Sequence, residues 1–156
     1  GHVLLLVGET AWHLGQSTLL AEVYGRIDGD APHVDLDAEK RNGDFIRANH
    51  TMITACTDLS DGGLALAAFE LAEKAGVGIS IDAEDTPTLF GEDQARYLIG
   101  CNFDMAESLM VAASKADVPI TMVGKVGGDT VSFGTQSAPL TALSATFRSA
   151  FAAAVA

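Results

Sequence analysis

Apolar residues along the chain alternate between short unbroken runs, which suit buried strands, and runs with a helical repeat. Residues 3–7 form the clearest strand candidate. Residues 63–75 form the clearest helix, because Leu and Ala recur at helical spacing and Gly76 follows as a natural helix end. The same patterns predict strands at residues 52–56, 77–81, 96–101, 120–126 and 131–133, and helices at residues 17–24, 37–49, 104–115 and 141–155.

The polar residues between these segments predict how the segments start and connect. Asp37 is the candidate cap of the helix over residues 37–49, and Ser60 or Asp61 is the candidate cap of the helix that starts at Gly63. Residues 82–87 are expected to form an acidic turn, and Gly127-Gly128-Asp129-Thr130 suits a tight hairpin between the two strands that flank it. Helices alternating with strands, together with a hairpin, predict a mixed β-sheet packed by helices, in the α+β class (α/β in the broad sense).

The composition is that of one soluble domain spanning residues 1–156. Hydrophobic residues make up 48% and charged residues 19%, and no apolar run approaches the ~20 residues of a membrane span. The formal net charge of −12 disfavours nucleic acid as a partner, and we expect no membrane partner. An acidic chain that binds phosphate groups usually does so through a divalent cation or one well-placed cationic side chain.

The cysteines bear on the cellular compartment of the protein, and the first residues bear on whether the chain is a domain of a larger protein. Cys56 and Cys101 lie in separate apolar runs, without the spacing of a zinc site or the density of a disulfide-rich domain. We therefore expect buried free thiols and a reducing, cytoplasmic location. Because the chain begins with Gly1 and enters a strand without a signal-peptide pattern, we expect it to be a domain of a larger protein.

The most informative segment is Thr57–Leu64, with the sequence Thr-Asp-Leu-Ser-Asp-Gly-Gly-Leu, between a predicted strand and the predicted helix 63–75. Backbone N–H groups converge at such a helix start and can bind phosphate. Asp58 and Asp61 would repel a bare anion, so the hypothesis requires that these two carboxylates bind Mg²⁺, which bridges them to the phosphate. A capped helix with a tight turn explains the same residues equally well.

Two further glycine-bearing segments have candidate chemistry. In the first, residues 89–97, Arg96 offers a planar guanidinium that suits phosphate or carboxylate, and Glu92 or Asp93 could hold a cation or a hydroxyl group. An ion pair between Arg96 and a neighbouring acid is the simpler interpretation. In the second, residues 127–130, a hairpin turn alone accounts for the residues.

The order of the motifs resembles one group of enzymes along almost the whole chain. The motifs are His13-Leu14-Gly15, Val34-Asp35-Leu36 followed by Glu39-Lys40-Arg41-Asn42-Gly43, residues 54–64, Leu89-Phe90-Gly91-Glu92-Asp93-Gln94, and Lys125-Val126-Gly127-Gly128-Asp129. Together they resemble the C-terminal domain of the synthetase subunit of phosphoribosylformylglycinamidine synthase, in the aminoimidazole ribonucleotide synthetase-like superfamily. The Ser-Asp-Gly-Gly turn is shared across that superfamily, and the Phe-Gly-Glu-Asp-Gln segment narrows the match.

The resemblance implies an ATP-dependent ligase of purine biosynthesis. Such a ligase activates the amide of formylglycinamide ribonucleotide with ATP and Mg²⁺, and ammonia from a separate glutaminase subunit then forms the amidine. Its partners would be the other domains of the synthetase, the glutaminase subunit and a small bridging subunit. In the full-length enzyme ATP or ADP and Mg²⁺ would be bound, whereas the isolated domain is expected to be inactive, with no catalytic residue of its own, and need not bind any of them.

Residues can be carried over from the resemblance one by one. Those implied at the nucleotide or substrate cleft are Ser60, Asp61, Gly62, Gly63, Gly91, Glu92, Asp93, Gln94 and Arg96, with Asp58 and Asp61 as the metal ligands. One residue departs from the family pattern: Gln16 stands where a glycine is common, which adds bulk where the backbone would approach a ligand.

Two alternatives stay open at this point. The chain is either the terminal domain of the ligase, with exposed apolar patches and an isolated form that can pair as a homodimer, or a non-catalytic phosphate-binding or interaction domain with a uniformly polar surface. Membership of another branch of the superfamily is a further alternative.

Overall fold

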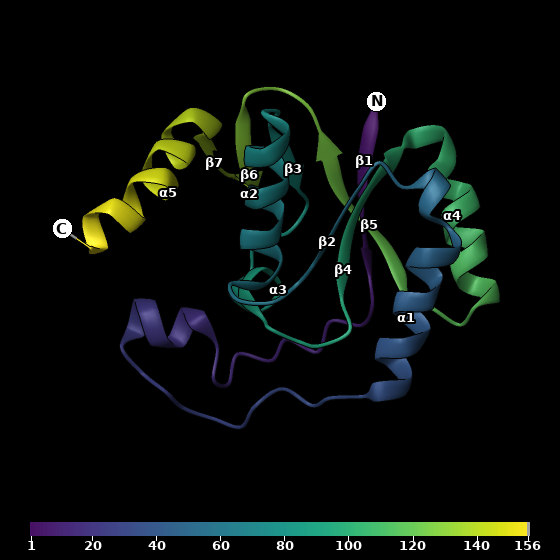
Figure 1. Cartoon of the computed structure of the whole chain (residues 1–156), viewed down its shortest axis with the longest axis horizontal. Helices are drawn as coiled ribbons and strands as arrows, with labels where there is room; N and C mark the ends of the chain where they lie inside the picture. The colour runs from purple at the N-terminus through teal and green to yellow at the C-terminus, as the bar shows by residue number, and fades with distance from the viewer. Residues whose placement is uncertain (156) are drawn as a thin grey trace.

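A seven-stranded mixed sheet forms the centre of the molecule, and the computed structural model describes residues 1–155 (Figure 1). Its strands are β1 (His2–Val7), β2 (Ala55–Asp58), β3 (Ile79–Ile81), β4 (Tyr97–Asn102), β5 (Ile120–Val126), β6 (Thr130–Phe133) and β7 (Gln136–Pro139). They lie in the order β2-β4-β1-β5-β3-β6-β7, and all neighbours are antiparallel except β3 and β6. The predicted α+β class is confirmed.

Helices cover both faces of the sheet (Figure 1). On one face lie α1 (Leu36–Ala48) and α4 (Phe103–Lys115), and on the other lie α2 (Gly63–Ala75), α3 (Thr86–Phe90) and α5 (Leu140–Ala154). Strand β1 runs between the two layers, so Leu4 and Leu6 pack toward α2 while Val3, Leu5 and Val7 pack toward α1 and α4. This burial on both faces explains why β1 is an unbroken apolar run.

The sheet order corrects the predicted hairpin between residues 120–126 and 131–133. Strand β3 lies between β5 and β6, and the hairpin instead joins β6 to β7, which the sequence pattern did not predict. Gly78 explains the crossing: its N–H donates to the Gly128 oxygen at 2.9 Å, and its own oxygen accepts from the Gly127 N–H at 2.8 Å. The two glycines therefore carry the chain past the start of β3.

The helix starts also differ from the predicted caps. Asp35, not Asp37, caps α1, and its carboxylate accepts from the N–H groups of Asp37 and Ala38 at 2.9 and 3.0 Å. Helix α2 has no side-chain cap, because the preceding residue Gly62 is left-handed at φ 76°, so neither Ser60 nor Asp61 caps it. Its predicted end at Gly76, φ 66°, is confirmed.

Smaller differences affect short segments. Two short helices flank α1 in the sequence. They are η1 (Leu19–Val23), a π-helix inside the predicted residues 17–24, and η2 (His50–Met52), a 3₁₀ turn where the predicted strand 52–56 begins. Helix α3 starts inside the predicted acidic turn. Cys101 is buried as predicted, whereas Cys56 is exposed. Within the described residues, no helix is long and apolar enough to cross a membrane.

Candidate functional site

The segment from Gly91 to Arg96 lies between α3 and β4 and is bound to the long loop that follows β1. Glu92 connects three elements: its Oε1 accepts from the Gly62 N–H at 2.8 Å and from the Thr18 N–H at 2.8 Å. Its own N–H donates to the His13 oxygen at 3.0 Å. The carboxylate thus satisfies two backbone donors of the protein, one of them at the glycine turn before α2.

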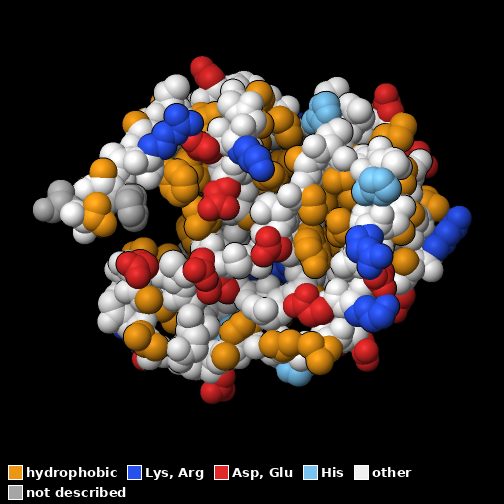
Figure 2. All heavy atoms as spheres, viewed as in Figure 1, with side chains coloured by type: hydrophobic (Ala, Val, Ile, Leu, Met, Phe, Trp, Pro, Cys, Tyr) orange, Lys and Arg blue, Asp and Glu red, His pale blue; other side chains and the backbone are white. Residues whose placement is uncertain are grey.

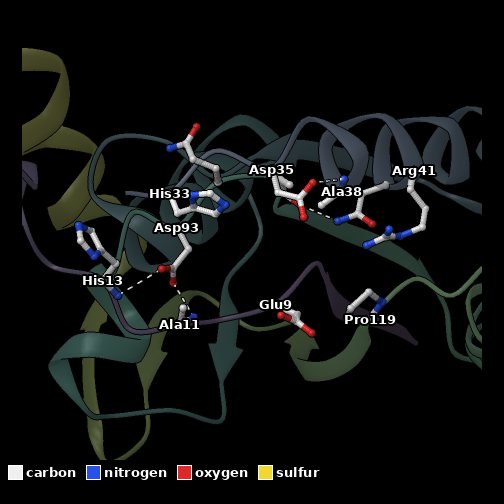
Figure 3. A pocket seen from close by; sticks show the side chains of 12 residues that line it. Glu9, Ala11, His13, His33, Asp35, Ala38, Arg41, Asp93 and Pro119 are labelled. Atoms are coloured by element: carbon white, nitrogen blue, oxygen red, sulfur yellow. Dashed lines mark hydrogen bonds between the residues drawn. The ribbon is translucent and has the colours of Figure 1, made fainter. Parts of the chain in front are cut away.

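Asp93 is buried and faces the same loop from the other side of the segment (Figure 3). Its Oδ2 accepts from the Ala11 N–H at 3.0 Å, and its Oδ1 accepts from the His13 N–H at 3.2 Å. Both carboxylate oxygens are therefore engaged by the backbone of residues 11–13, and Asp93 sets the path of that loop.

Arg96 is buried, with 1% of its surface exposed. Its Nη2 donates to the Gly91 oxygen at 2.5 Å, its Nε donates to the Asp93 oxygen at 3.2 Å, and its Nη1 donates to Thr10 Oγ1 at 3.3 Å. The Asp93 carboxylate is 3.8 Å from Nη2. Burial lowers the pKa of Arg96, and the negative charge of Asp93 acts in the opposite direction. The proximity to Asp93 agrees with the simpler interpretation of the sequence, an ion pair with a neighbouring acid, and the bond to Thr10 also links the segment to the loop after β1.

Two residues of α1 complete this arrangement; they belong to a motif of the resemblance but were not among the predicted site residues. Glu39 Oε1 accepts from the Ala95 N–H at 2.9 Å, and Asn42 Nδ2 donates to the Ala95 oxygen at 2.8 Å. Ala95 itself is left-handed at φ 58°. The signal available in the sequence was Asn42, a polar residue on the apolar face of an amphipathic helix.

The glycine turn before α2 packs against the same segment. Gly63 is left-handed at φ 60°, and a Cβ atom there would lie 2.5 Å from the Gly91 oxygen. The close backbone approach that the sequence predicts at these glycines is an approach to Gly91 of the protein itself. Asp58, Ser60 and Asp61 are all exposed around this turn.

The predicted site residues therefore divide into two sets. The structure brings together Gly62, Gly63, Gly91, Glu92, Asp93 and Arg96 through hydrogen bonds and contacts inside the protein. Asp58, Ser60, Asp61 and Gln94 are exposed and can face a ligand. Across residues 1–155, no three or more His, Cys, Asp or Glu side chains are arranged to hold a metal ion, so a cation at Asp58 and Asp61 would need further oxygens from its ligand.

Gln16, which stands where the family commonly has a glycine, adopts a backbone conformation that suits glycine. It is left-handed at φ 58°, the conformation that glycine adopts most easily. Its side chain donates to the Gly29 oxygen at 2.8 Å, and its N–H donates to the Asp28 oxygen at 2.8 Å. Gln16 therefore connects the residues before η1 to the residues that follow it.

Comparison with known proteins identifies the family. The sequence profile of the AIR synthase related protein, C-terminal domain, matches residues 1–135. The chain belongs to this family.

Relatives with high sequence identity to this chain include PurL subunits. Phosphoribosylformylglycinamidine synthase subunit PurL of a Ruegeria species is 70% identical over 156 residues, which are 100% of this chain and 22% of the relative. The PurL subunit of Brucella ovis is 49% identical over 134 residues, which are 83% of this chain and 18% of the relative. The chain thus spans about a fifth of the length of these relatives.

Solved structures share the fold. PurL of Thermotoga maritima, complexed with FGAR, has a TM-score of 0.75 at 19% identity over 92% of this chain and 28% of its own. Thiamine-monophosphate kinase of Stenotrophomonas maltophilia has a TM-score of 0.64 at 19% identity, over 88% and 51%. The resemblance to this superfamily and the mixed sheet are confirmed.

Proposed function

We propose that this chain is the C-terminal domain of an ATP-dependent ligase that converts formylglycinamide ribonucleotide to its amidine in purine biosynthesis. The observation that carries the proposal is 70% identity along the whole chain to about a fifth of a PurL subunit. Sequence identity of this level along the whole chain is higher than a shared fold requires, because the thiamine-monophosphate kinase has the same fold at 19% identity.

The surface supports a domain that contacts other domains. Several large apolar side chains are exposed in the loop between β1 and α1, among them Trp12 at 61%, Ile27 at 79% and Val34 at 53%. Patches of apolar side chains follow the lower edge of the molecule in Figure 2, where this loop runs in Figure 1. Exposed apolar surface of this kind is typical of interfaces. The missing domains of the synthetase are the proposed partners, with the glutaminase and small bridging subunits in the full complex; a solved relative is named PurLQS.

The inward set of residues suggests what this domain contributes. Because the bonds of Glu92, Asp93 and Arg96 are made within the protein, we propose a structural role for them: they hold one wall of the interdomain cleft. Asp58, Ser60, Asp61 and Gln94 are the groups proposed to face a nucleotide or substrate, with the backbone of Gly62 and Gly63 behind them. Mg²⁺ often uses one or two carboxylates together with phosphate oxygens, so Asp58 and Asp61 fit such a cation. The ATP complex of the Thermotoga protein supports a nucleotide in the larger enzyme.

A chimaera tests the proposed function. The 156 matching residues of the Ruegeria PurL subunit are replaced by this chain, and ATP-dependent amidine formation is measured with ammonia. We expect activity of the same order as the unmodified relative. A matched chimaera with the C-terminal domain of the Stenotrophomonas kinase, which has the same fold, is expected to be inactive. A folded but inactive first chimaera would contradict the proposal.

Nucleotide binding is tested separately on this chain. Calorimetric titration with ADP and ATP is carried out with Mg²⁺ and again with excess chelator. If the exposed carboxylates bind a phosphate-bridging cation, any binding requires Mg²⁺ and is lost in Asp58→Asn and Asp61→Asn. Equal binding in chelator would contradict the metal role.

A further inference from the structure

A pocket of about 440 Å³ lies between α1, the loop after β1 and the segment 93–95 (Figure 3). Its wall includes Arg41, Asn42, Asp93 and Gln94, and it contains none of residues 58–63. Its volume falls in the range of about 300–1,000 Å³ that small-molecule sites occupy.

One wall of this pocket carries a buried acceptor and a buried donor that have no hydrogen-bond partner within the described part of the chain. The acceptor is Asn42 Oδ1 and the donor is Arg41 Nε. Asn42 is 2% exposed, and the orientation of its amide is fixed, because the Ala95 oxygen can only accept and so must face Nδ2. An unpaired buried polar atom is unfavourable, and each such atom calls for a partner.

The charges around the pocket exclude an anion as that partner. Glu9, Asp35 and Asp93 contribute three carboxylates, and Arg41 is the one permanently charged cation among the lining residues. The ring of His13 is already bonded, its Nε2 lying 2.7 Å from the Asp30 oxygen. A phosphate or carboxylate would therefore be repelled, whereas an uncharged ligand would not.

Access to these two atoms requires a movement of the pocket wall. Both atoms are shielded from solvent, so a ligand must displace part of the wall. Gln94 and His33 are exposed, and Gln94 is held only by a 3.3 Å bond to the Glu92 oxygen. Neither the bonds of the Asp93 carboxylate nor the bond from Asn42 to Ala95 involves the Gln94 side chain, so Gln94 can rotate without breaking them.

We propose that this pocket binds a small uncharged ligand that presents an N–H donor close to an acceptor, with the N–H bound by Asn42 Oδ1 and the acceptor bound by Arg41 Nε. An aminopurine base and a primary carboxamide share this chemistry. The proposal goes beyond the proposed function, because it concerns a pocket other than the exposed carboxylates at the glycine turn.

Matched ligands test the proposal on the unmodified chain. Calorimetric or NMR titrations compare adenosine with purine riboside, which lacks the amino group and has no other N–H donor on its base, and nicotinamide with nicotinate, which replaces the amide by a carboxylate. We expect adenosine or nicotinamide to bind and its matched partner to bind about tenfold more weakly or less, the loss expected for one hydrogen bond. The member that binds identifies the source as a base or a carboxamide. Absence of binding by both, or equal binding by a matched partner, would overturn the proposal.

A pair of variants tests the residue assignment. Arg41→Lys keeps the positive charge but removes Nε, and we expect about tenfold weaker binding of the ligand identified above. Arg47→Lys is the control, because Arg47 lies on the same helix with its side chain 84% exposed. Thermal unfolding confirms that both variants are folded. Unchanged affinity in Arg41→Lys would overturn the assignment. The nucleosides and amides used here need no Mg²⁺ and no other domain, so a negative result leaves the chimaera experiment unaffected.

Discussion

Four acidic residues of the predicted site form two pairs with opposite environments. Glu92 and Asp93 accept hydrogen bonds from backbone N–H groups of three separate segments, whereas Asp58 and Asp61 are exposed. The first pair builds the loops around the site, and the second pair is available to a ligand. Residues that a motif places side by side therefore have different physical roles, and variants of the two pairs should separate stability from binding.

The largest effect is expected at Arg96, which holds the inward pair in place. Arg96→Leu leaves the buried Asp93 carboxylate without its cation and frees the Gly91 oxygen, so the free energy of unfolding should fall by about 3–5 kcal/mol. Urea denaturation measures the change. Arg47→Leu is the control on an exposed arginine, for which a change within about 0.5 kcal/mol is expected. Equal stability of Arg96→Leu and the unmodified chain would contradict the structural role.

The next effect concerns the glycine turn that Glu92 anchors. Gly63→Ala places a Cβ 2.5 Å from the Gly91 oxygen and forces a left-handed alanine, so we expect a loss of about 2–4 kcal/mol. Gly76→Ala is the matched control at the other end of α2: it is also left-handed, but no atom lies within 4 Å of its Cβ, and a loss of about 1 kcal/mol is expected. Equal losses would mean that contact with the segment 91–96 is unimportant.

A smaller effect is expected from the charge of Glu92 itself. Glu92→Gln keeps an oxygen for the N–H groups of Gly62 and Thr18 but removes the charge that strengthens both bonds, for a loss of about 1–2 kcal/mol in urea denaturation. Asp61→Asn changes the charge of an exposed residue on the same turn and should alter stability by less than about 0.5 kcal/mol. A reversed order of the two variants would show that the pairs are wrongly assigned.

The sequence predicts elements better than it predicts contacts between them, and the reasons are specific. The unbroken apolar run of β1, and the helical repeat and final glycine of α2, locate both elements closely. Burial on both faces of β1 and on one face of α2 fixes these apolar patterns. The pairing of β6 with β3 leaves no such signal, since it depends on hydrogen bonds between Gly78, next to β3, and two glycines far along the chain, Gly127 and Gly128. The local propensities of the sequence therefore do not predict that pairing.

The same limit applies to the candidate site. The motif suggested Arg96 for an anion and Glu92 or Asp93 for a cation or hydroxyl group. Instead, the two carboxylates accept from backbone N–H groups of residues 11–18 and 62, which lie far away in the sequence. Arg96 donates to oxygens of the protein itself. Only the fold shows that these polar groups satisfy one another. Asn42 could have been recognised from sequence, because a polar residue at a core position of a helix requires a specific bond.

The smallest effect is expected at Asp35, an exposed carboxylate that is nevertheless bonded, and it appears only in acid. The backbone N–H of Ala38, followed by that of Asp37, lowers the pKa of Asp35 below its ordinary value of 3.8. The unfolded chain therefore binds a proton at higher pH than the folded chain, so this carboxylate stabilises the fold above 3.8, and the contribution is lost as the pH falls through the lower folded pKa.

Asp35→Asn isolates this contribution, because the asparagine oxygen still caps α1 but does not titrate. We expect the variant to have a slightly lower urea midpoint than the unmodified chain at neutral pH, with a difference that shrinks below pH 3.8 as Asp35 becomes protonated. Asp37→Asn, in the first turn of the same helix, removes a charge without removing a cap and serves as the control. A midpoint difference for Asp35→Asn that stays constant down to the lowest pH would mean that the charge of Asp35 adds nothing to the cap, and it would contradict the contribution assigned to its lowered pKa.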